Sequence, residues 1–69
     1  MTLREALEKN KWNYIRIDDM FKGSLVKLGT DWLEYYENDK IMGQWCLDQP
    51  ISAYDEEPNA DYYEVLIVI

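Results

Sequence analysis

Residues 55 to 61 contain the most regular array of potential ligand groups in this chain. A side-chain oxygen stands at every second position, in Asp55, Glu57, Asn59 and Asp61. The loop of an EF-hand calcium site spaces its first ligands in the same alternating way. The match then fails, because Ala60 stands where that loop needs glycine and Leu66 stands where it needs a bidentate glutamate. We therefore expect a solvated acidic loop here and no metal site.

Groups that enzymes use for nucleophilic and acid–base chemistry are scarce. The chain has no histidine, and its single cysteine, Cys46, has no basic residue after it to stabilise a thiolate. We expect Cys46 to be a small packed thiol. Carboxylates are plentiful, but a glycosidase holds its pair in a deep cleft that 69 residues hardly form. We predict that the protein is not an enzyme and needs no cofactor.

The charge of the chain is unevenly distributed. The formal net charge is −7, yet residues 1–29 carry a net +2 and residues 30–40 a net −3. Residues 41–69 contain six acidic groups and no Lys or Arg. Nucleic acid repels such a surface, because binding depends on neutralising phosphates, whereas basic proteins are attracted to it. We therefore expect a protein partner and no direct contact with nucleic acid.

Tyrosines among acidic groups form the candidate binding surface. Ten of the 69 residues are aromatic, six of them tyrosines, and a sheet with one helix can cover only one of its faces. Exposed tyrosines supply rigid contact area at modest entropic cost. The predicted partner-binding residues are Tyr35, Tyr36, Tyr54, Asp55, Glu56, Glu57, Asp61 and Tyr62.

Two functions are compatible with these features. The first is a small acidic interaction module, which binds a basic or nucleic-acid-binding protein or forms a homodimer. The alternative is an acidic inhibitor of a nucleic-acid-binding protein, in which carboxylates stand in for DNA phosphates. In size and charge, though in no motif, the chain is similar to small acidic inhibitors from phages and mobile elements.

The elements that must position these residues centre on Asp31 to Leu47. Residues of this stretch alternate in polarity on both sides of Glu37–Lys40, which favours two aromatic-rich strands joined by a tight turn. In this hairpin Gly43 would mark a bulge or a large side chain packed across from it. A second interpretation is a helix from Thr30 or Asp31 to Glu37, with Glu34 closing a capping box. We prefer the hairpin.

The rest of the chain is easier to interpret. Thr2 and Glu5 fit a capping box that opens a short helix, with Asn10 as its end. Strands are predicted from Trp12 to Asp18 and from Leu25 to Leu28, and Gly23 is free to take positive φ in the turn between them. The five aliphatic residues from Val65 to Ile69 indicate a central strand buried on both faces.

The predicted architecture is a single α+β domain over residues 1–69. A short N-terminal helix packs on a curled, mainly antiparallel sheet of four to five strands. The expected core contains Leu3, Leu7, Ile15, Ile17, Leu28, Leu33, Ile41, Trp45, Leu47, Val65, Ile67 and Ile69, together with Trp12. A single cysteine and the lack of a signal-like or membrane-length apolar segment predict a soluble, cytoplasmic protein.

Overall fold

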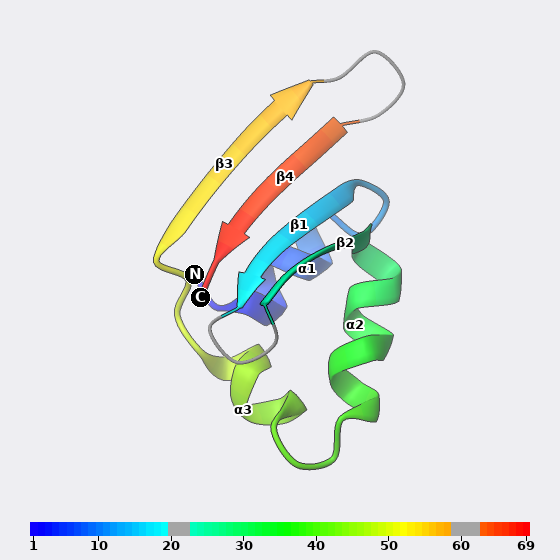
Figure 1. The fold of residues 1–69 in the computed structure, drawn as a ribbon, viewed down its shortest axis with the longest axis vertical. Coiled ribbons are helices and arrows are strands. Elements are labelled where there is room, and N and C mark those ends of the chain that lie inside the picture. Colours follow the sequence, from blue (N-terminus) through cyan, green and yellow to red (C-terminus); the bar gives the residue numbers. More distant parts are fainter. Residues whose placement is uncertain (20–22, 59–62) are drawn as a thin grey trace.

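The computed structural model describes residues 1–19, 23–58 and 63–69. In chain order the elements are α1 (Leu3–Lys9), β1 (Tyr14–Asp19), β2 (Gly23–Leu28), α2 (Gly29–Asn38), α3 (Gly43–Asp48), β3 (Ala53–Pro58) and β4 (Tyr63–Val68). Figure 1 shows these elements as a sheet in front of three helices. The predicted α+β class is confirmed.

The sheet is mixed, with the strand order β2-β1-β4-β3. β1 pairs with β2 and β3 pairs with β4 in antiparallel fashion, whereas the two central strands, β1 and β4, are parallel. A parallel pair needs a long crossover, which α2, α3 and β3 supply. Of the prediction, the four strands and two antiparallel pairs of three are found, but the sheet is not curled and its central pair is parallel. The predicted central position of the C-terminal strand is confirmed.

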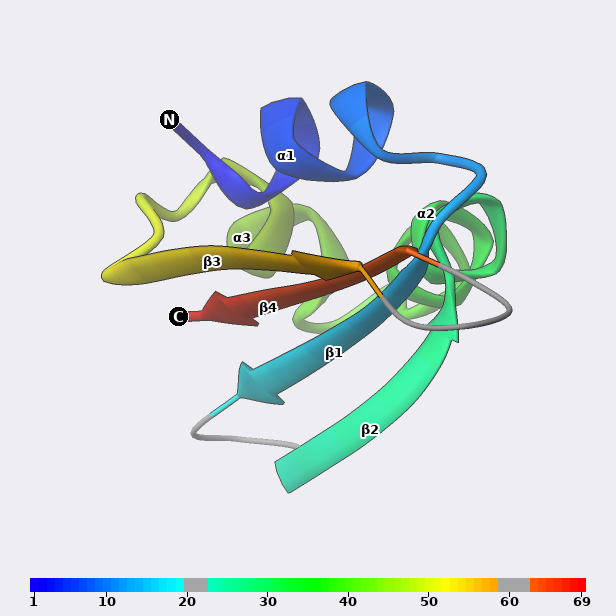
Figure 2. The same ribbon diagram turned by 90° about the horizontal axis from the view of Figure 1, so that it is seen from above.

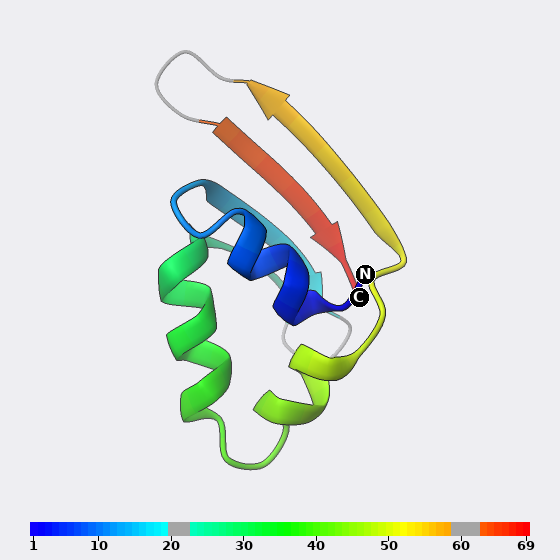
Figure 3. The ribbon, with the colours of Figure 1, turned by 180° about the vertical axis from the view of Figure 1, so that it is seen from behind.

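All three helices lie on one face of this sheet (Figures 2 and 3). Ile15 and Ile17 of β1 and Val65 and Ile67 of β4 point to that face and are fully buried. Strand side chains alternate between faces, so the intervening residues point to the other side. No helix covers that side in the described part of the chain, and it is called the open face below.

α1 forms as its sequence predicts. The Thr2 side chain accepts a hydrogen bond from the backbone of Glu5, and the Glu5 carboxylate accepts one from the backbone of Thr2. This capping box satisfies donors that the first turn leaves unpaired. The helix ends at Lys9 with Asn10 as its C-cap and buries Leu3, Ala6 and Leu7.

The predicted hairpin over residues 31–47 is wrong, because the stretch forms α2 and α3. Buried residues follow helical spacing in both, at Gly29, Trp32 and Tyr36 and then at Gly43, Cys46 and Leu47. The second interpretation, a helix ending near Glu37, is closer to the structure. Its capping box is absent, since α2 begins at Gly29 with Leu28 as N-cap and no side-chain cap bond.

Gly43 is not a strand bulge but a point of close approach between helices. A Cβ atom at this position would lie 1.6 Å from the carbonyl oxygen of Tyr36. Glycine therefore permits α3 to pack directly against the C-terminal part of α2. The other glycine prediction is confirmed, since Gly23 has a φ of 86°.

The core is partly the predicted one. Seven of the expected residues are fully buried, namely Leu3, Leu7, Ile15, Ile17, Leu47, Val65 and Ile67. Three expected residues are exposed instead: Ile41 by 90%, Trp12 by 73% and Trp45 by 47%. The strand period predicts Ile41 and Trp45 inside, but Ile41 lies in the turn between α2 and α3, and Trp45 lies on the outer side of α3. Ala6, Trp32, Tyr36 and Cys46 complete the core.

The predicted acidic loop is also corrected. Asp55, Glu56, Glu57 and Pro58 belong to β3, an edge strand, rather than to a loop. Positions 59 to 62 lie outside the described residues. No helix in the described part of the chain is long and apolar enough to cross a membrane.

Candidate functional site

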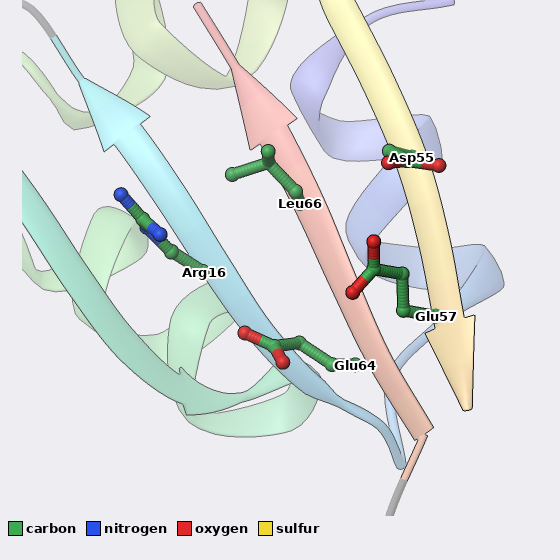
Figure 4. Close-up of a pocket in the computed structure, with 5 residues that line it drawn as sticks. All are labelled: Arg16, Asp55, Glu57, Glu64 and Leu66. Carbon is green, nitrogen blue, oxygen red and sulfur yellow. The ribbon is translucent and has the colours of Figure 1, made fainter. Parts of the chain in front are cut away.

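The open face has an acidic part and an apolar part. Its acidic part lies on β3 and β4, where Asp55, Glu57 and Glu64 share one side of the sheet by strand alternation. These side chains surround a hollow of about 270 Å³ whose other lining residues are Arg16 and Leu66 (Figure 4). This hollow is the candidate site.

Two of the carboxylates are directly opposed. Glu57 on β3 and Glu64 on β4 are cross-strand partners in the antiparallel register. Like charges directly opposite each other on neighbouring strands destabilise a sheet. The acidic part therefore concentrates negative charge at a cost in stability.

Arg16 does not lie among these carboxylates as a counter-charge. Its Nε donates to Ser24 Oγ at 3.0 Å and lies 3.4 Å from Asp18 Oδ1. Figure 4 shows its guanidinium pointing along β1, away from Glu64 and Glu57. Arg16 with its partner Asp18 adds no net charge to the open face, so the local field stays negative.

The apolar part lies on β1 and β2. Tyr14 is 43% exposed and Val26 is 54% exposed. Leu28 is half-buried beside them, opposite Tyr14 in the β1–β2 register. An aromatic and two aliphatic side chains thus adjoin the acidic part on one continuous sheet surface.

The predicted binding residues are dispersed rather than brought together. Of this set, Asp55 and Glu57 lie on the open face, and Asp61 and Tyr62 lie outside the described residues. Tyr36 is fully buried and cannot contact a partner. Tyr35 is half-buried, with its ring edge against the rings of Trp32 and Tyr36.

Tyr54 and Glu56 form a structural cluster on the helix-covered side. Asn10 Nδ2 donates to the Tyr54 hydroxyl at 2.6 Å, and that hydroxyl donates to Glu56. Tyr63 donates to the other Glu56 oxygen at 2.8 Å, while Lys9 Nζ lies 3.9 Å from the carboxylate. The cluster ties the end of α1 to β3 and β4.

Hydrogen bonding in this cluster changes its acidities. Hydrogen bonds from the Tyr54 and Tyr63 hydroxyls hold the pKa of the Glu56 carboxyl below its usual range. Burial, and then the bond to Glu56, raises the pKa of Tyr54 to about 12. The bond to Glu56 also raises the pKa of Tyr63. Glu56 is therefore an ionised acceptor that holds two strands together.

Tyr14, Val26 and Glu64 are not among the predicted binding residues. Tyr14 and Val26 alternate with buried or helix-facing neighbours, so strand period could have placed them on the uncovered side. The importance of Glu64 depends on its register with Glu57, for which the sequence offers no signal.

Metal and thiol chemistry have no support among the described residues. No three His, Cys, Asp or Glu side chains within residues 1–19, 23–58 and 63–69 gather as metal ligands would. Cys46 is buried, in line with its predicted role as a packed thiol.

Comparison with known proteins gives no further guide, since no family model, curated protein or solved structure matches this chain.

Proposed function

We propose that this protein is a small, non-enzymatic interaction module whose open face binds a basic protein. The observation that carries the proposal is the opposed pair Glu57 and Glu64, with Asp55 on the same face. A sheet selected for stability alone avoids like charges across strands. Violations of a local rule of this kind are expected at functional sites.

The apolar part of the open face supports the same proposal. Tyr14, Val26 and Leu28 offer contact area beside the carboxylates. Burial of these side chains supplies affinity, while the acidic part attracts and orients a positively charged partner. A partner with basic and apolar side chains on one surface complements both parts.

Non-enzymatic function and a cytoplasmic location belong to the proposal. The sequence has no histidine, and its one thiol, Cys46, is buried in α3. A binding role needs neither a nucleophile nor a general base. A free thiol is typical of a reducing compartment.

The experiment compares two charge-matched double variants in binding. Glu57→Gln with Glu64→Gln neutralises the opposed pair, and Glu8→Gln with Glu37→Gln neutralises two exposed residues on the helix side. Each purified protein is immobilised and exposed to cell lysate at low and high salt. A partner retained by the helix-side variant and lost with the open-face variant supports the proposal. Equal retention by both variants contradicts it.

Mimicry of DNA is the second candidate, supported by charge alone. Duplex DNA presents long rows of phosphates, whereas the described β3 directs two carboxylates, those of Asp55 and Glu57, to the open face. The described part of β4 adds a single carboxylate, Glu64. If the captured partner binds nucleic acid and duplex DNA displaces it, mimicry is the better account.

A further inference from the structure

A different surface lies along the outer edge of β2. The strand pairs with β1 on one side and with no other strand in the described part of the chain. Its first four residues are exposed, and they include Leu25 and Val26. The outward backbone groups of an edge strand can pair with a further strand.

The two edges of the sheet differ in how they resist such pairing. β3, at the opposite edge, carries three consecutive acidic residues and ends in Pro58, which cannot donate to a ladder. Charges and proline are the usual protection of an edge. β2 contains no proline and a single charged residue, Lys27, whose ammonium is held against the Tyr35 ring. It is therefore the less protected edge, at which a strand can be added.

A groove runs beside this edge. It has a volume of about 480 Å³ and lies between β2 and α2. The lining residues are Val26, Lys27 and Leu28 of β2, Asp31, Glu34, Tyr35 and Asn38 of α2, and Tyr14 of β1. Figure 1 shows that α2 follows directly from β2 and flanks this side of the sheet.

The charges in the groove select the kind of occupant. Asp31 and Glu34 are exposed, about one helical turn apart, and form no ion pair with the described residues. The ammonium of Lys27 lies 4.7 Å from the centre of the Tyr35 ring, so its charge is held against an aromatic face. The groove thus presents two carboxylates to an incoming segment.

We propose that this groove binds an extended, basic segment of a partner protein, which adds to the sheet as a fifth strand beside β2. Backbone hydrogen bonds to β2 fix the segment in register, and its alternate side chains face α2. Lysine or arginine at those positions pairs with Asp31 and Glu34. A second copy of this chain fits less well, because the only basic residue in its own β2 is Lys27. The groove shares Tyr14, Val26 and Leu28 with the apolar part of the open face, but its carboxylates, Asp31 and Glu34, belong to α2 and not to β3 or β4.

The test uses a synthetic peptide of alternating lysine and valine, about as long as β2. It is titrated into the isotope-labelled protein while backbone amide chemical shifts are recorded. We expect shifts in β2 and the first turns of α2. In a strand, alternate N–H groups point to opposite sides, so one set of alternate N-methylations should weaken binding at least tenfold and the other set should spare it.

Two variants locate the charge contribution. The double variant Asp31→Asn with Glu34→Gln should lower the affinity for the peptide several-fold. The double variant Glu57→Gln with Glu64→Gln should leave this affinity unchanged. Absence of shifts at millimolar peptide, or equal binding of the two methylated peptides, overturns the proposal. Shifts confined to β3 and β4, and lost in the Glu57 and Glu64 variant, would also overturn it while supporting the proposed function of the open face.

Discussion

The hydroxyl of Tyr36 donates a 2.9 Å hydrogen bond to Oδ2 of Asp19, and both side chains are buried. One turn earlier in α2, Trp32 Nε1 donates to the carbonyl oxygen of Ile15 at 2.8 Å. The two rings stack, with centroids 5.6 Å apart. Two consecutive turns of α2 are thus fixed to the two ends of β1 by directional bonds inside the core.

Replacement of Tyr36 by phenylalanine tests this connection. The substitution keeps the ring and removes a donor from a buried carboxyl oxygen, so we expect a loss of about 1–3 kcal/mol in the free energy of unfolding. Urea denaturation measures it. The matched control is Tyr63→Phe, which removes a hydroxyl bonded to a carboxylate at the surface and should cost clearly less. A larger effect at Tyr63 would contradict this account.

Stability should fall at alkaline pH. Burial raises the pKa of Tyr54 to about 12, and burial followed by the bond to Asp19 raises the pKa of Tyr36 further. An unfolded tyrosine loses its proton near pH 10, so the folded state holds more protons above that pH. The contribution of the protonated tyrosines to the free energy of unfolding is complete below about pH 10. The part from Tyr54 is lost as the pH rises through about 12, and the part from Tyr36 is lost at higher pH. Unfolding free energies measured across this range should decline, and Tyr36→Phe should flatten the decline.

Residues 31 to 47 show where sequence reasoning stops. Trp32, Leu33, Tyr35 and Tyr36 suit one face of a helix and also a half-buried strand, so local pattern does not choose between them. Contacts with residues distant in sequence favour the helix over the strand. In the helix, Trp32 and Tyr36 both reach β1, where they bond to Ile15 and Asp19. By contrast, β1 and β4 combine aliphatic residues with a clear strand pattern and are predicted almost to their ends.

The candidate site, like the fold, was predicted only in part. Asp55 and Glu57 were predicted from the acidic character of their segment, and both line the hollow. Glu56 was selected for the same reason, but strand alternation carries it to the opposite face, where Tyr54 and Tyr63 bond it. Glu64 was missed because its role arises from pairing with Glu57, a fact of register rather than composition.

Paired substitutions distinguish the helical path from the predicted hairpin. Ile41→Ser alters a side chain that is 90% exposed and should change stability by no more than about 0.5 kcal/mol. Trp32→Ala empties a fully buried site and should cost about 3–5 kcal/mol. A hairpin with Ile41 in the core would give a large loss for the serine variant. Chemical denaturation of both proteins decides between the two.

Three glycine-to-alanine variants should differ in a fixed order. Gly43→Ala places a Cβ 1.6 Å from the Tyr36 carbonyl oxygen and should cost about 3 kcal/mol or more, because α2 and α3 must separate. Gly29→Ala meets the Asn10 carbonyl at 2.4 Å and should also be strongly destabilising. Gly23→Ala meets nothing within 4 Å, so only its positive φ opposes it, at about 1–2 kcal/mol. Thermal unfolding of the three variants gives their order of stability. A Gly23→Ala protein less stable than the Gly43→Ala protein would contradict the prediction.

Neighbouring glutamates on β3 should respond oppositely to the same substitution. Glu57→Gln removes one member of a like-charge pair and should stabilise the protein by ~0.2–1 kcal/mol, an effect that shrinks as salt screens the charges. Glu56→Gln weakens an ionised acceptor of two tyrosine hydroxyls and should destabilise it. Urea unfolding at low and high salt measures both. If Glu57→Gln also destabilises, the opposed pair is a structural feature and its use as evidence for binding fails. If it stabilises the fold while releasing a basic partner, the open face retains Glu57 at the expense of stability, as expected of a residue kept for binding.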